Sequence, residues 1–117
     1  MKPDADMMKE TEKLLKEMGG LYKFSDIIMA IREGKMQSFS LGRTWVVTQV
    51  HEFPRRKVVD IVFVIGDMED VAQIEPEVEA FAHRIGATLL MANGRLGWLK
   101  RHFEGWKAVS CNFVREI

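Results

Sequence analysis

Carboxylates gather in one short stretch of the chain, "GDMEDVAQIEP", at residues 66–76. Asp67, Glu69 and Asp70 lie at the start of a helical pattern, where their charge interacts favourably with the helix dipole and their oxygens can cap free amides. Such a cluster can also bind a cation. We favour a capped, solvated helix start, and the cation site stays the second interpretation.

The three histidines, His51, His83 and His102, share no spacing that is typical of a metal site. Glu52 follows His51, but no second histidine on a helix completes a zinc motif. His102 can in principle transfer a proton near neutral pH, although a solvated or partly packed imidazole is the favoured interpretation. The sequence therefore predicts no metal site.

A glycine-rich stretch, "GRLGWLKRHFEGW" at residues 94–106, has the pattern of a structural motif. Its early glycines let the chain turn at once into a short helix, which Trp98 packs down. Gly105 is expected to end the helix in the left-handed conformation, so that Trp106 starts the next strand against the core. Arg95 either caps strand-end carbonyls, the favoured interpretation, or contacts a ligand. The residues of this motif are Gly94, Arg95, Gly97, Trp98, Gly105 and Trp106.

Composition argues against a nucleic-acid module. The chain has 17 Lys and Arg and 17 Asp and Glu, so no overall field attracts nucleic acid or an anionic membrane. The turn "PRRK" at residues 54–57 is basic, and a solvated hairpin turn is favoured there over contact with phosphates.

The sequence also predicts a reducing compartment. The single cysteine, Cys111, cannot form a disulfide within the chain, and its apolar surroundings predict that it is buried. No apolar run approaches the length of a membrane span, and the N-terminus lacks the apolar segment of a signal peptide. We therefore expect a cytoplasmic protein without membrane contact.

Helical patterns occupy three segments. Residues 1–20 place methionines and leucines on one stripe, which either covers the chain's own core, the favoured interpretation, or binds a partner. A second helix is expected after Ser25 or Asp26, with Gly34 at its end. Apolar positions recur at helical intervals in residues 71–85, and Pro76 favours a helix that begins at this residue.

Strand patterns alternate with the helices. Three segments within residues 36–65 predict an antiparallel meander. In the last of them, one apolar face is expected to carry Val59, Ile61, Phe63 and Ile65, with Asp60 on the other. Residues 87–92 are expected to run parallel to that strand through a right-handed crossover, and residues 107–117 are expected to form a final strand. The fold class is mixed α/β, with an antiparallel meander followed by a βαβ unit.

This order of elements, with the glycine-tryptophan motif, resembles the GCN5-related N-acetyltransferase (GNAT) fold. In that family two parallel strands splay apart and admit the pantetheine arm of acetyl-coenzyme A; here they would be residues 58–66 and 87–92. Residues 94–106 are also similar to small GNAT-like proteins of tailed phages, including internal virion proteins of short-tailed phages. The resemblance implies one GNAT-like domain, residues 21–117, preceded by the helix of residues 1–20.

The resemblance implies a cofactor site that this sequence fits poorly. Family members hold the cofactor diphosphate on the amides of a glycine-rich loop at a helix start. Here a single glycine is followed by four carboxylates, Asp67, Glu69, Asp70 and Glu75, which repel phosphates. If the chain is an enzyme, the residues implied to bind the cofactor are Gly66, Asp67, Val71 and Arg95.

The catalytic residues implied by the resemblance are also incomplete. Many family members place a tyrosine, acting as the acid, four residues before the closing glycine; counted back from Gly105, that position is Arg101. The remaining candidates for proton transfer are Asp67 or Glu69, acting through water, and His102.

Two functions are therefore compatible with the sequence. The favoured one is a phage-type structural or interaction protein, which includes a role as a virion component, with a degenerate acetyl-coenzyme A site and no cofactor. It would bind a protein partner or itself through the N-terminal helix, in the host cytoplasm or the virion. The alternative is a divergent acetyl-coenzyme A-dependent N-acetyltransferase that acts on an amine of a small molecule or protein.

Overall fold

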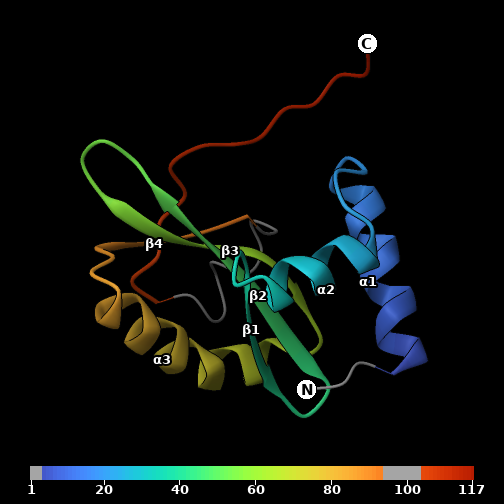
Figure 1. The fold of residues 1–117 in the computed structure, drawn as a ribbon, viewed down its shortest axis with the longest axis horizontal. Helices are drawn as coiled ribbons and strands as arrows, with labels where there is room; N and C mark the ends of the chain where they lie inside the picture. Colours follow the sequence, from blue (N-terminus) through green and yellow to red (C-terminus); the bar gives the residue numbers. More distant parts are fainter. Residues whose placement is uncertain (1–3, 94–103) are drawn as a thin grey trace.

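The computed structural model describes residues 4–93 and 104–117 (Figure 1). The predictions for Gly94, Arg95, Gly97, Trp98 and His102 lie outside the described residues. The helices and strands, in chain order, are α1 (Ala5–Glu17), α2 (Phe24–Arg32), β1 (Gln37–Leu41), β2 (Thr44–Glu52), β3 (Lys57–Ile65), α3 (Met68–Arg84) and β4 (Leu89–Ala92).

The strands form one 4-stranded sheet in the order β1-β2-β3-β4. β1, β2 and β3 pair antiparallel, and β4 lies parallel to β3 after the crossover through α3. A tight turn at Gly42, whose φ is +57°, joins β1 to β2. The predicted meander, the βαβ unit and the mixed fold class are therefore confirmed.

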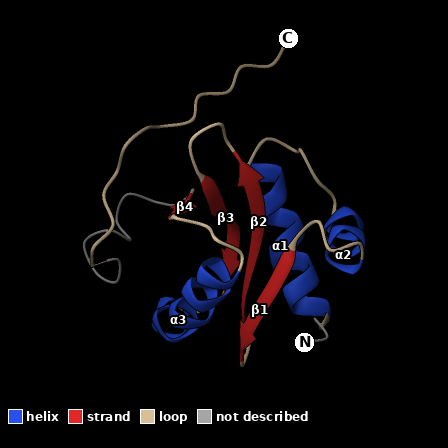
Figure 2. Ribbon diagram, turned by 60° about the vertical axis from the view of Figure 1, so that its left-hand side comes forward, coloured by secondary structure: helices blue, strands red, loops and turns tan. Residues whose placement is uncertain are grey.

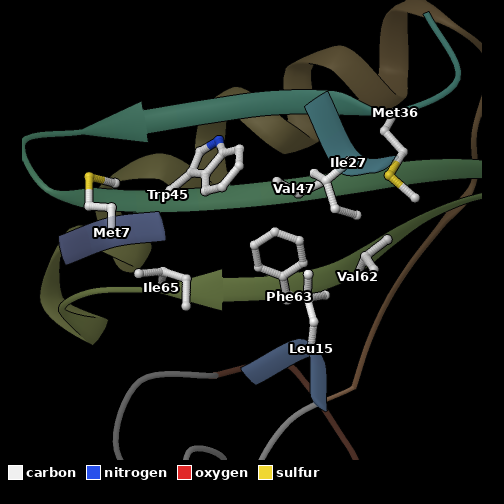
Figure 3. Packing of buried hydrophobic residues seen from close by; sticks show 9 residues of the cluster. All are labelled: Met7, Leu15, Ile27, Met36, Trp45, Val47, Val62, Phe63 and Ile65. Atoms are coloured by element: carbon white, nitrogen blue, oxygen red, sulfur yellow. The ribbon is translucent and has the colours of Figure 1, made fainter. Parts of the chain in front are cut away.

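Helices cover both faces of the sheet. Figure 2 shows α1 and α2 on one side and α3 on the other. The core under α1 and α2 includes Trp45 and Phe63, whose rings meet edge-on with centroids 5.4 Å apart (Figure 3). A second core, which includes Val59 and Ile74, lies under α3. Burial on both faces explains why β3 is apolar at nearly every position.

The apolar stripe of α1 packs on this chain's own sheet. Met7 and Leu15 are buried in the core under α1 and α2. The carboxylate of Asp4 caps the helix by accepting a hydrogen bond from the Met7 amide at 2.9 Å. Glu12 accepts one from the amide of Phe24 at 2.8 Å, which ties α1 to the start of α2. Binding of a partner through the N-terminal helix stays a prediction.

An extra residue in β3 interrupts its pairing with β2. Val47 pairs with Phe63 and Thr48 pairs with Ile61, so Val62 is a bulge. A slip of one residue moves every following side chain to the opposite face. Ile61 therefore packs under α3, whereas Phe63 packs under α1 and α2. The prediction of one continuous apolar face is wrong for Val59, Ile61, Phe63 and Ile65.

Two helices begin earlier than predicted. α2 starts at Phe24, and Asp26 reaches back from inside the helix to accept a hydrogen bond from the Lys23 amide at 2.9 Å. α3 starts at Met68 and continues through Pro76, although proline removes one helical hydrogen bond. Burial against the sheet stabilises α3 on both sides of the proline, through Val71, Ile74, Val78 and Ala82.

Residues 107–117 form no strand, so the prediction of a final strand is wrong for this structure. Figure 1 shows the segment running away from the sheet as an extended trace. It approaches β4 only near the end of that strand, where the Asn112 amide donates to the Asn93 side-chain oxygen at 3.1 Å. Cys111 is exposed rather than buried. A strand needs a paired neighbour, so the apolar composition alone does not produce one.

Candidate functional site

The turn from β3 into α3 depends on a glycine. Gly66 has a φ of +113°, and a Cβ atom at this position would lie 2.7 Å from the Cα of Thr44. The buried Thr44 hydroxyl accepts a hydrogen bond from the Asp67 amide at 3.0 Å and donates one to the Asp70 carboxylate at 2.7 Å. The glycine therefore allows a close approach that fixes where the helix begins.

The amides at the start of α3 are engaged within the chain. The carboxylate of Asp67 accepts a hydrogen bond from the Glu69 amide at 2.9 Å. Its backbone carbonyl accepts from the amides of Asp70 and Val71 at 3.1 and 3.2 Å. The helix start is thus capped by its own residues, which is the arrangement that the sequence favours.

This turn does not fit the diphosphate of acetyl-coenzyme A. A phosphate at the helix start would compete with Asp67 for the Glu69 amide and would approach several carboxylates. Val71, one of the predicted cofactor contacts, is buried in the core under α3. Gly66 and Asp67 do lie at the turn, whereas Arg95 is outside the described residues. Cofactor contacts by these residues stay a prediction.

The described end of the glycine-tryptophan motif packs against α3. Gly105 has a φ of +87°, the left-handed value that the sequence predicts. Trp106 packs against the core under α3, and its indole N–H donates to the Glu75 carboxylate at 2.8 Å. The packing of Trp106 is as predicted, but no strand begins there.

The basic turn after β2 is used inside the chain. The guanidinium of Arg56 donates to the Thr88 carbonyl at 2.6 Å and to its hydroxyl at 3.1 Å. Lys57 donates to the Ile85 carbonyl at 2.9 Å, close to the end of α3. These bonds hold the start of β4 against β3, so the two basic residues have a structural use.

β4 pairs with only the first part of β3. The parallel register extends from the Val58 and Leu89 pair to the Ile61 and Ala92 pair, and it ends one residue before the bulge at Val62. Within residues 4–93 and 104–117, no strand lies beside the remainder of β3 on this side. The described pairing of the two parallel strands therefore ends where β4 ends, at Ile61 and Ala92, and the splay that the resemblance implies stays a prediction.

A histidine and a carboxylate meet beside this point. His51 on β2 and Asp60 on β3 place Nε2 and Oδ2 3.5 Å apart. The ring of Phe53 lies 5.9 Å from that of His51. Asp60 lies two residues before Val62 and one before Ile61, the last residue paired with β4. Asp60 is therefore one residue away from Ile61, where the described pairing of β3 with β4 ends.

Burial changes the acidity of this carboxyl group. Desolvation raises the pKa of Asp60 above its ordinary value of 3.8, and the neighbouring His51 lowers it by a smaller amount. The Asp60 side chain is 20% exposed and that of His51 is 40% exposed. A carboxylate of raised pKa is a stronger base than an ordinary surface aspartate, so it accepts a proton more readily.

Sequence reasoning missed this pair. The strand pattern places Asp60 on the less apolar face of its strand, and the spacing of the histidines presents His51 only as a metal ligand without a partner. The register that brings them together depends on the hairpin between β2 and β3. The available signal was a charged residue inside an otherwise apolar strand, since an unpaired charge is rarely buried.

Comparisons with known proteins support the fold. No family model matches the chain, and no curated protein matches it. An aminoglycoside acetyltransferase from an uncultured soil metagenomic sample, solved with sisomicin, matches with a TM-score of 0.65 at 8% identity, over 96% of this chain and 87% of that one. A wild-type protein from Thermus thermophilus matches with a TM-score of 0.59 at 13% identity, over 99% and 98% of the two chains.

A third structure, of a probable acetyltransferase, matches with a TM-score of 0.57 at 8% identity, over 96% of this chain and 95% of that one. Identities this low show the fold alone. The chain therefore has a GNAT-like fold. Among the described residues, no helix is long and apolar enough to span a membrane.

Proposed function

We propose that this GNAT-like chain is a phage-type structural or interaction protein, a component of the virion, whose β3–α3 turn serves its own fold instead of acetyl-coenzyme A. The observation that carries the proposal is the self-capped start of α3. The virion role rests on the resemblance of residues 94–106 to small phage proteins alone, and no match to a family model or a curated protein adds to it.

The physical argument concerns competition for the same hydrogen-bond donors. An anion at a helix start is stabilised by free amides and by the helix dipole. Here Asp67 already accepts from the Glu69 amide, and the Asp70 carboxylate is held by Thr44. A diphosphate would have to displace the Asp67 carboxylate from the Glu69 amide, and it would still lie close to the Asp70 carboxylate. Binding of the diphosphate is therefore disfavoured by both geometry and charge.

Titration calorimetry with acetyl-coenzyme A near neutral pH tests the proposal, and the expected result is no specific binding in the micromolar range. A variant with Asp67→Asn, Glu69→Gln and Asp70→Asn removes three charges at nearly constant side-chain size. A gain of affinity in this variant that shrinks with added salt would assign the exclusion to charge. Micromolar binding by the parent protein would contradict the proposal.

The second candidate function is an N-acetyltransferase that acts on an amine. It is favoured by the His51 and Asp60 pair, which lies beside Ile61, where the described pairing of β3 with β4 ends. An ammonium group must lose its proton before its nitrogen can act as a nucleophile, and Asp60, whose pKa is raised by burial, is the base that we propose for this step. The neighbouring His51 can exchange the proton with solvent.

Product analysis separates the two functions. The chain is incubated with acetyl-coenzyme A and a panel of primary amines, including an aminoglycoside, and acetylated products are measured by mass spectrometry. Turnover by the parent protein that is lost in Asp60→Asn, and kept in the surface variant Glu10→Gln, would establish the second function. Absence of turnover in all three proteins supports the first.

A further inference from the structure

The C-terminal segment, residues 107–117, exposes large apolar side chains to solvent. Four of them are exposed by 74% or more: Val109, Phe113, Val114 and Ile117. Single exposed apolar residues are common, but a cluster of this kind within eleven residues of extended chain marks an interaction surface. The segment also contains neither glycine nor proline, so its backbone can pair as a strand.

The sheet has an open edge that such a segment fits. β4 pairs with β3 on one side, and in the described part of the chain no strand lies on its other side. Leu89 and Met91 on β4 are 37% and 39% exposed. An edge strand of this kind presents unpaired N–H and C=O groups that another extended segment can satisfy.

The path of the segment directs it away from its own β4. Trp106 is held against α3 through Glu75, and Asn112 contacts Asn93, which follows the end of β4. The residues after Asn112 therefore continue beyond that strand, and Figure 1 shows the C-terminus standing clear of the rest of the chain. Phe113, Val114 and Ile117 are left without an apolar neighbour to cover them.

We propose that residues 107–117 pair as a strand with the open edge of β4 in a second copy of this chain. Each copy supplies one segment and one edge, so the exchange closes as a two-fold dimer and leaves neither surface unused. The partner is thus a second copy of the chain, and self-association would be one interaction within the proposed interaction role. The inference rests on the proposed interaction role, but self-association and cofactor binding are measured in separate experiments.

Light scattering after size-exclusion chromatography tests the exchange on the full chain. We expect twice the mass of one chain for the parent and the mass of one chain for Phe113→Asp, with unchanged circular dichroism. Ser110→Asp is the matched control, since residues 110 and 113 face opposite sides of a strand. This variant is expected to stay a dimer.

Three results would overturn the proposal. The first is a parent protein that is a monomer at high micromolar concentration. The second is a Phe113→Asp variant that remains a dimer. The third is an unfolded Phe113→Asp variant, because it would show that the segment covers its own chain. Since calorimetry with acetyl-coenzyme A is unaffected by these results, failure of the exchange is distinguishable from failure of the proposed function.

Discussion

At the scale of single residues, Gly66 connects the sheet to the candidate site. Its positive φ is a conformation that other residues adopt only with strain, and its close contact with Thr44 leaves no room for a side chain. The position is therefore constrained twice, by backbone conformation and by packing. The local order of the β3–α3 turn depends on both constraints.

We expect Gly66→Ala to lower the free energy of unfolding by roughly 2 to 4 kcal/mol, from backbone strain together with the contact with Thr44. The matched control is Gly20→Ala, where φ is +67° but no atom lies within 4 Å of the added Cβ. Its loss should be closer to about 1 kcal/mol, since only the strain remains. Urea unfolding curves measure both; equal losses would show that the contact with Thr44 is unimportant.

Asp60 is expected to make stability depend on pH. Because burial raises its pKa in the folded chain above the ordinary 3.8, its contribution to stability is fully present below that pH and is lost as pH rises through the folded-state pKa. Asp60→Asn does not titrate there. The stability of this variant relative to the parent should therefore increase as the pH is raised from below 3.8 toward neutral.

Urea unfolding at a series of pH values measures this difference, with the exposed Glu10→Gln as the reference for the general response of the chain. His51 lowers the pKa of Asp60, so Asp60→Asn should show a larger difference when both proteins of the comparison also carry His51→Gln. A difference that is constant with pH would contradict the prediction.

At the scale of elements, α3 contains a residue that weakens it. Pro76 lies inside the helix and cannot donate to the carbonyl of Ala72, yet the helix continues because its apolar face is buried. Pro76→Ala should raise the free energy of unfolding by about 1 to 3 kcal/mol. Glu77→Ala, at the next exposed position, controls for alanine's own helix preference. A loss of stability in Pro76→Ala would show that the proline has a packing role.

Most elements could be predicted from the sequence because each has a local cause. Glycines at the ends of helices, β-branched runs in the strands and a crossover of standard length are visible in the chain itself. The bulge at Val62 is not visible, because β3 is apolar on both faces and a slip of one residue leaves no mark on its pattern. The same limit hid the contact between His51 and Asp60, which depends on register.

The candidate site also has features that the sequence predicts and features that depend on tertiary packing. The capped start of α3 follows from Asp67 and Asp70, whose preference for helix starts is local, so the sequence sufficed to predict it. The continuation of α3 through Pro76 could not be predicted, since proline usually opens a helix and only tertiary burial overrides this preference. Residues 107–117 have the composition of a strand, but composition does not specify the neighbour.

At the scale of the whole molecule, α1 acts as a cover for one face of the sheet. Deleting residues 1–20 removes Met7 and Leu15, each of which contributes roughly 1.5 to 3 kcal/mol by burial, and exposes the core around Trp45. We therefore expect a large loss of stability or no cooperative transition at all. The control is Met8→Ala, at a position exposed by 42% on the same helix.

Thermal unfolding followed by circular dichroism measures this effect. A truncated chain that melts at nearly the parent temperature would contradict the packing of α1 as a cover. It would also strengthen the interpretation of residues 1–20 as a segment that binds a partner.

The bulge at Val62 makes the length of β3 as important as its composition. Two cores on opposite faces take their side chains from the same strand, and the extra residue is what lets Ile61 serve one and Phe63 serve the other. If β3 paired with β2 without the bulge, Ile61 and Phe63 would face the same side of the sheet, so one of the two cores would lose side chains from this strand. Deletions in this strand should therefore be tolerated far less than substitutions between Val, Ile and Leu.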